Sequence, residues 1–391
     1  MHRLAAALAF LPLAALAQPV EQGPPNADFA PAFANQTRAP ALTQTDVIAE
    51  TLVAGLDAPW GIAPLPGVGW LVTERPGRLR IVTTDGRLSV PIEGLPEVDD
   101  RRQGGLLDVA ISPDFAADRL VFWTYAKRVR GGTVTAAARG RLSEDLTALT
   151  EVQDIFVQSP PSRTPMHYGS RIIPMADGTA WITTGEHSSR AERVLAQDIG
   201  TTYGKVVRVT WDGAPVPGNP FVGREGDDAI WSLGHRNIQG AAVDPLGRLW
   251  TVEHGPRGGD ELNRPEPGLN YGWPVVSYGI NYNGTGVGSG EARGAGFEEP
   301  VYYWDPVIAP GGMAFYDGTA FGDWQGDILI GSLNPGGLVR LSLDGGRVAG
   351  EERLMPDVGR VRDVEVLPDG TLLLLIDAGR PDGAVLRVRP G

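Results

Sequence analysis

The stretch MADGTAWITT, residues 175–184, places an Asp-Gly turn directly before a run of β-branched and aromatic residues. Glycine accepts the positive φ that tight turns need, while Thr, Trp and Ile favour strands. Similar units stand at residues 112–115 (SPDF), 244–247 (DPLG) and 367–370 (LPDG), each before a strand-like run. A turn-plus-strand unit that recurs every few tens of residues is typical of a β-propeller.

Short apolar or alternating runs, each closed by Gly, Pro or Asp, continue along the chain. They lie at residues 69–74, 79–82, 120–125, 179–184, 205–209, 248–253, 327–331 and 371–376. Helical periodicity is almost absent, so the pattern predicts an all-β fold. About six blades fit between Val47 and Pro390. We therefore expect a six-bladed β-propeller over residues 45–391, with a sandwich or two stacked barrels as the less repetitive alternative.

Composition indicates one large domain and limits the chemistry. The chain has 391 residues, 42% hydrophobic, and its 53 glycines and 33 prolines are spread along the sequence instead of marking a linker. A net charge of −13 and the lack of a basic run oppose a nucleic-acid partner. Because the chain has no cysteine, disulfides, thiolate ligands and a cysteine nucleophile are excluded.

The N-terminus has the pattern of a secretory signal. A charged start is followed by an apolar run over Leu4 to Leu16 that ends in Ala-Leu-Ala, which predicts export to the periplasm or beyond and cleavage near Ala17. The run is shorter than the roughly 20 residues that span a bilayer, so no membrane span is expected. Residues 18–44, rich in Pro, Ala, Asn and Gln, are predicted to form a poorly ordered leader.

Two polar clusters border predicted strands. The segment HYGSR opens at His167 and runs into a strand that ends at Glu186, and the segment GHRN at residues 234–237 precedes a strand that ends near Glu253. Loops at one end of a propeller converge on its channel. We therefore expect these imidazole, guanidinium, amide and carboxylate groups to share one active site.

Six motifs in order resemble those of the soluble, pyrroloquinoline quinone (PQQ) dependent aldose sugar dehydrogenases of the glucose/sorbosone dehydrogenase family, from about Leu52 to Arg389. They are QGGLLDVA (103–110), HYGSR (167–171), GHRN (234–237), GP with DE (255–256 and 260–261), NYGW (270–273) and RVRDV (360–364). The resemblance implies a six-bladed propeller that oxidises the C1 hydroxyl of an aldose to a lactone, with PQQ as the hydride acceptor.

The resemblance also implies catalytic roles. His167 matches the family's general base, and imidazole suits that task because its pKa lies near neutrality. Glu186 matches the carboxylate that orients this ring. Arg236 and Asn237 match the pair that contacts the quinone oxygens, where a guanidinium would stabilise developing negative charge.

Further cofactor contacts follow from the same resemblance. Arg360 and Arg362 are two residues apart on a predicted strand, so they point the same way and could bind a carboxylate of PQQ. Gln103 matches another cofactor contact. Asn334 stands where relatives carry a lysine that reaches the cofactor, which predicts weaker attraction to a carboxylate at that position.

Calcium is the metal that the resemblance implies. Gly255 and Pro256 match positions whose carbonyls hold the ion bound to the cofactor, and Glu261 and Tyr271 match a separate calcium site. Both sets suit the preference of calcium for oxygen donors.

Two other functions compete with this reading. A calcium-dependent lactonase on a propeller would also need an acidic metal cage, but not the arginine pair. A noncatalytic propeller that binds a sugar or a protein would need neither. The sequence leaves the sugar, the electron acceptor (a cytochrome or a quinone) and the choice between monomer and homodimer open.

Overall fold

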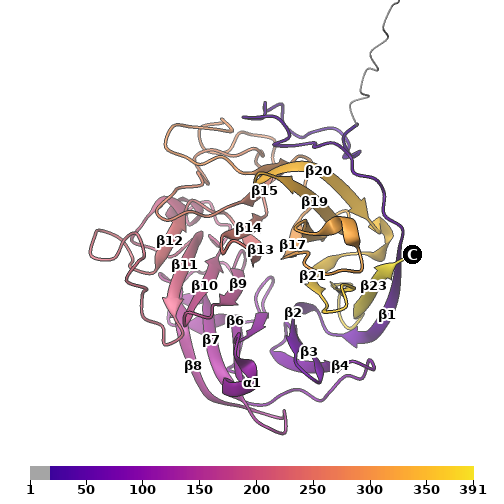
Figure 1. The fold of residues 1–391 in the computed structure, drawn as a ribbon. Helices are drawn as coiled ribbons and strands as arrows, with labels where there is room; N and C mark the ends of the chain where they lie inside the picture. The colour runs from indigo at the N-terminus through magenta and orange to yellow at the C-terminus, as the bar shows by residue number, and fades with distance from the viewer. Residues whose placement is uncertain (1–17) are drawn as a thin grey trace, which may run out of the picture.

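The computed structural model describes residues 18–391, so the predicted signal peptide at residues 1–17 lies outside the described residues. Almost all regular structure in the described chain is β-strand, in six antiparallel sheets arranged around a centre (Figure 1). The predicted all-β, six-bladed propeller is therefore confirmed. No helix in residues 18–391 is long and apolar enough to cross a membrane.

Each sheet forms one blade, and its strands follow one another along the chain from the centre outward. Blade 1 contains β2 (Pro59–Leu65), β3 (Gly69–Glu74) and β4 (Arg78–Thr83). Blade 2 contains β5 (Leu106–Ile111), β6 (Leu120–Val129), β7 (Gly132–Leu142) and β8 (Leu149–Val157). Blade 3 contains β9 (Gly169–Pro174), β10 (Thr179–Thr184), β11 (Lys205–Thr210) and β12 (Ile230–Leu233).

The second half of the ring repeats this order. Blade 4 contains β13 (Ile238–Val243), β14 (Leu249–Glu253), β15 (Asp260–Asn263) and β16 (Tyr302–Trp304). Blade 5 contains β17 (Pro310–Phe315), β18 (Ile328–Ser332), β19 (Leu338–Asp344) and β20 (Arg347–Leu354). Blade 6 contains β21 (Val361–Val366), β22 (Leu372–Ile376), β23 (Gly383–Pro390) and, at its outer edge, β1 (Val47–Leu56).

The few helices are short and lie in loops. They are α1 (Phe115–Asp118) and the 3₁₀ helices η1 (Arg193–Gln197), η2 (Gly322–Trp324) and η3 (Pro356–Val358). The Asp-Gly turns predicted from the sequence connect the first and second strands of a blade. Asp177 accepts hydrogen bonds from the backbone and hydroxyl of Thr179, and Asp369 does the same for Thr371. Gly178 and Gly370 adopt φ values of 79° and 80°, which favour glycine.

Apolar cores between neighbouring blades hold the ring together. Leu71 and Trp123 belong to the core between blades 1 and 2, and Trp250 and Ile330 to that between blades 4 and 5. The first strands of the blades contact one another around the centre. The loops at one end of these strands are thereby brought together.

A buried ion cluster crosses this centre. The Arg171 guanidinium of β9 lies 2.9 Å from Asp108 of β5 and 3.0 Å from Asp363 of β21, and it stacks over Trp60 at 4.4 Å. Burial raises the pKa of Asp108 to about 6, although the Arg171 charge opposes this shift. Arg171, Asp108 and Asp363, each from one of the quoted motifs, thus connect blades 3, 2 and 6 beneath the loops.

The prediction of a poorly ordered leader at residues 18–44 is wrong. Asn26 binds both carboxylate oxygens of Asp305, and Gln36 is fully buried and donates to Pro300 O. Ala39 is also fully buried, within the core of blades 4 and 5. The polar composition misled the prediction because these polar groups are hydrogen-bonded to the Asp305 carboxylate and to a buried backbone carbonyl in place of water.

Candidate active site

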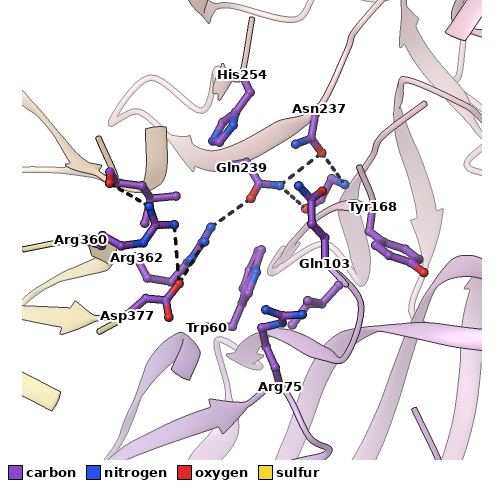
Figure 2. Close-up of a pocket in the computed structure, with 13 residues that line it drawn as sticks. Trp60, Arg75, Gln103, Tyr168, Asn237, Gln239, His254, Arg360, Arg362 and Asp377 are labelled. Atoms are coloured by element: carbon purple, nitrogen blue, oxygen red, sulfur yellow. Dashed lines mark hydrogen bonds and ion pairs between the residues drawn. The ribbon is translucent and has the colours of Figure 1, made fainter. Parts of the chain in front are cut away.

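A cavity opens at the end of the channel where the second strand of each blade ends. Its walls come from all six blades. Figure 2 draws the lining residues, which are Trp60, Arg75, Gln103, Leu107, Tyr168, Gly169, Asn237, Gln239, His254, Leu333, Arg360, Arg362 and Asp377. Four of the predicted cofactor residues, Gln103, Asn237, Arg360 and Arg362, are among them. Gln103 and Arg360 are also exposed, so they mark the opening of the cavity.

The cavity carries an excess of positive charge. Arg75, Arg360 and Arg362 face a single lining carboxylate, Asp377, which lies 3.9 Å from Arg360 and 3.5 Å from Arg362. The Nε of Arg362 is buried without a partner in the described chain. Burial lowers the pKa of Arg362 to about 10, against the attraction of Asp377, so the group stays charged near neutral pH. These guanidiniums therefore suit an anionic ligand.

His167 and Glu186 form a buried pair beside the cavity. Nδ1 of His167 lies 3.0 Å from Oε1 of Glu186, and both side chains are almost fully buried. Gln103 accepts a hydrogen bond from the His167 backbone N–H at 2.9 Å. His167 itself is not among the lining residues, but its neighbours Tyr168 and Gly169 are. His167 therefore directly precedes, in the sequence, two residues of the cavity wall.

The electrostatics of this pair favour a neutral imidazole. Burial, followed by the charge of Arg236, lowers the pKa of His167, while Glu186 raises it. Burial tends to raise the pKa of Glu186, but the His167 hydrogen bond and the Arg236 charge bring it below its usual value. Because the carboxylate is ionised, Nδ1 carries the proton and donates it to Glu186. Nε2 is then the basic nitrogen.

Arg236 lies between this cavity and a second, smaller one. Its Nη1 donates to His254 O at 2.8 Å, and its guanidinium stacks over Trp273 at 5.2 Å. Its Nε is buried without a partner in the described chain. Arg236 lines the smaller cavity, whereas Asn237 and His254 line the larger one.

The smaller cavity gathers most of the predicted metal residues. Gly255, Glu261 and Tyr271 line it together, although the sequence predicts two separate calcium sites. Glu253 of β14 lies directly opposite Glu261 of β15, and burial, with the Glu253 charge, raises the pKa of Glu261 well above its usual value. Within residues 18–391, no group of three or more His, Cys, Asp or Glu side chains is arranged to hold a metal ion.

Three further observations bear on calcium. The Asn263 side chain donates to both Glu253 and Glu261 and leaves its own buried oxygen without a partner. Two facing carboxylates and a free amide oxygen are donors that calcium prefers. The Tyr271 hydroxyl, in contrast, donates to Arg264 O and accepts a hydrogen bond from Glu266 N, so it is already engaged by backbone groups.

Two predicted residues lie away from the cavities. Asn334 is exposed and lines neither cavity, and its neighbour Leu333 instead presents a carbonyl to Arg360 at 3.0 Å. Pro256 is buried but also lines neither. Sequence reasoning missed Arg75, Asp377 and Trp60. Arg75 and Asp377 directly follow strands β3 and β22, and that position at a strand end is the signal that could have found them.

The structure is thus a six-bladed propeller with an arginine-rich cavity at one end of its channel, a cavity whose charge suits an anionic ligand. Over residues 56–387 the sequence matches the family described as glucose/sorbosone dehydrogenase. The chain belongs to that family.

Relatives agree with this assignment. Aldose sugar dehydrogenase YliI of Escherichia coli is 41% identical over 360 residues, which cover 90% of this chain and 94% of that protein. The apo crystal structure of a soluble aldose sugar dehydrogenase from Escherichia coli superposes with a TM-score of 0.84 at 41% identity, covering 88% of this chain and all of the other. A PQQ-bound aldose sugar dehydrogenase from Streptomyces coelicolor gives a TM-score of 0.73 at 31% identity, with 90% and 99% covered.

Proposed function

We propose that this protein is a PQQ-dependent aldose dehydrogenase that oxidises the C1 hydroxyl of a sugar to a lactone. The observation that carries the proposal is the cluster of Arg75, Arg360 and Arg362 around one carboxylate in a chain of net charge −13. PQQ carries three carboxylates, so it fits this excess of cations. The name of the relative from Escherichia coli and the PQQ-bound relative from Streptomyces coelicolor support the same assignment.

Different residues of the chain would bind the cofactor and accept the proton. Arg360 and Arg362 would hold a carboxylate of PQQ, and the buried Nε groups of Arg236 and Arg362 offer unpaired donors to its oxygens. When bound, PQQ supplies an acceptor for a hydride. Nε2 of His167 would take the hydroxyl proton of the sugar, with Glu186 fixing the ring and stabilising its charged form.

Calcium and export belong to the same proposal. A calcium ion between Glu253 and Glu261, with the Asn263 oxygen and the carbonyl of Gly255 as further donors, would relieve the repulsion between the two carboxylates. Export to the periplasm, with loss of residues 1–17, rests on the sequence pattern alone.

The test is reconstitution of the purified protein. We expect calorimetry to detect PQQ binding in the presence of calcium, and dye reduction with glucose to require both additions. Arg362→Gln should weaken PQQ binding by roughly 10-fold or more, because it removes a hydrogen-bonded charge pair. The matched exposed variant Arg389→Gln should bind normally. A protein that binds no PQQ at tens of micromolar would instead favour a noncatalytic propeller.

A further inference from the structure

Exposed arginines gather on the rim of blade 2, beside the cavity. Three segments, residues 99–103, 126–131 and 161–166, form what we call the blade-2 rim. Asp99 N donates to Ala126 O at 2.8 Å, and Gln103 N donates to Pro165 O at 3.3 Å, so the segments lie side by side. The exposed arginines of this rim are Arg101, Arg102, Arg128, Arg130 and Arg163.

The blade-2 rim adjoins the opening of the cavity. Gln103 belongs to the rim and lines the cavity, and the lining residue Arg75 donates through Nη2 to Arg102 O. On the other side, the lining residue Tyr168 is hydrogen-bonded through its hydroxyl to Thr133, at the start of β7 and next to the 126–131 segment. A molecule bound at the rim would therefore stand directly at the cavity opening.

Internal ion pairing does not account for the charge of the rim. Arg101 and Arg128 share Asp99, which is fully buried and lies 2.6 and 3.5 Å from them. Within residues 18–391, Arg102, Arg130 and Arg163 have no carboxylate within 4.0 Å. Asp100, the other acid of the segment, pairs with Arg380 at 3.8 Å. The chain as a whole is negative, with 47 acidic and 34 basic residues, so the charge of this surface is opposite in sign to the net charge of the protein.

We propose that the blade-2 rim is the docking surface for an acidic redox protein that removes the electrons of sugar oxidation. The inference rests on the proposed dehydrogenase function. Oxidation of one hydroxyl to a carbonyl releases two electrons and two protons, so two one-electron acceptor proteins are reduced for each sugar and the protons pass to solvent. A positive surface next to the cavity opening steers an acidic acceptor to the place where the electrons leave.

The test compares acceptors of opposite charge. The triple variant Arg102→Gln/Arg130→Gln/Arg163→Gln removes the unpaired charges at exposed positions, so it should fold normally. With the PQQ- and calcium-loaded protein, the bimolecular rate constant for reducing an acidic c-type cytochrome should fall about 10-fold at low ionic strength, and its salt dependence should flatten. Reduction of the cationic dye phenazine methosulfate should not slow.

The matched control removes the same charge from the other end of the molecule. Arg87, Arg387 and Arg389 are exposed arginines near the strand ends away from the cavity, and the triple change to Gln should leave the cytochrome rate unchanged. The inference is overturned if the rim variant reduces the acidic cytochrome at the parental rate, if the dye rate falls equally, or if a basic cytochrome is the faster acceptor at low salt. Absence of dye reduction by the parent protein would instead contradict the dehydrogenase function itself.

Discussion

At the residue scale, burial and neighbouring charges set the pKa of the His167 imidazole. His167 is buried beside Arg236, and both conditions lower its pKa, while Glu186 at 3.0 Å raises it. The ring is therefore neutral at pH 7 and able to accept a proton. Nδ1 is engaged by Glu186, so the basic nitrogen is Nε2.

Replacing His167 tests its role as the base. General-base catalysis contributes about 10²–10⁴-fold, so His167→Gln should lower kcat by that order while PQQ binding measured by calorimetry changes little. The neighbouring histidine, His187, is unsuitable as a control variant because it is fully buried and its Nε2 is hydrogen-bonded to Gln158 at 2.7 Å. Parental turnover in His167→Gln would place the base elsewhere.

Replacing Glu186 tests the pair through its pH dependence. The folded pKa of His167 lies below 6.5, so kcat/KM should be lost on the acid side, below pH 6.5, as the ring becomes protonated. Because Glu186 raises this pKa, Glu186→Gln should move the acid limb of the kcat/KM–pH profile to still lower pH and reduce kcat. Glu192→Gln, a carboxylate of the same loop with no bond to His167, should leave the limb in place. A limb that moves upward would contradict the assignment.

At the element scale, strand pairing sets which side chains meet. Glu253 and Glu261 face each other because β14 and β15 pair antiparallel in that register, and neither sequence position alone reveals the contact. Likewise, Arg360 and Arg362 both reach Asp377 because residues two apart at the start of a strand share a face.

The facing carboxylates of Glu253 and Glu261 lead to a prediction about calcium binding. In chelator, Glu261→Gln should keep or raise the melting temperature, because it removes a carboxyl group whose ionised form is disfavoured by burial and by the Glu253 charge. In calcium, the parent should gain stability by mass action, about 2.7 kcal/mol at 100 times Kd, and the variant should gain less. Glu266→Gln, at a partly exposed position on the following loop, is the control. Equal calcium-dependent shifts in parent and Glu261→Gln, measured by calorimetry, would remove this residue from the site.

At the scale of the whole molecule, the ring is closed by its two ends. β1 pairs antiparallel with β23 from Val47↔Pro390 to Leu56↔Gly383, so the first strand of the chain completes the last blade. Leu56 is fully buried and joins Leu373 and Val72 in the core between blades 6 and 1. The contact between blades 6 and 1, which completes the ring around the cavity, therefore includes this closing strand.

A change in the closing strand should therefore destabilise the ring. Leu56→Ala leaves a cavity between blades 6 and 1 and should lower the free energy of unfolding by about 2–5 kcal/mol. Ile48→Ala lies in the same strand at a 37% exposed position and should cost less than about 1 kcal/mol. Urea unfolding followed by tryptophan fluorescence measures both. Equal losses would show that closure does not depend on this contact.

The sequence by itself determined the features that arise from local structure. Turn residues and β-branched runs give strands such as Gly69–Glu74 and Thr179–Thr184 within their predicted limits, because turn and strand preferences act over a few residues. The motifs also placed Gln103, Asn237, Arg360 and Arg362 at one site, and all four line the cavity.

Only the tertiary structure decided which distant groups meet. Arg75 and Asp377 are 302 positions apart in the numbering and lack a distinctive motif, yet blades 1 and 6 bring both to the cavity. Conversely, Asn334 occupies a family position but turns to solvent, and the polar segment at residues 18–44 becomes ordered against blades 4 and 5. These outcomes depend on how six sheets close into a ring and which buried groups then need partners, and no local pattern of residues specifies that.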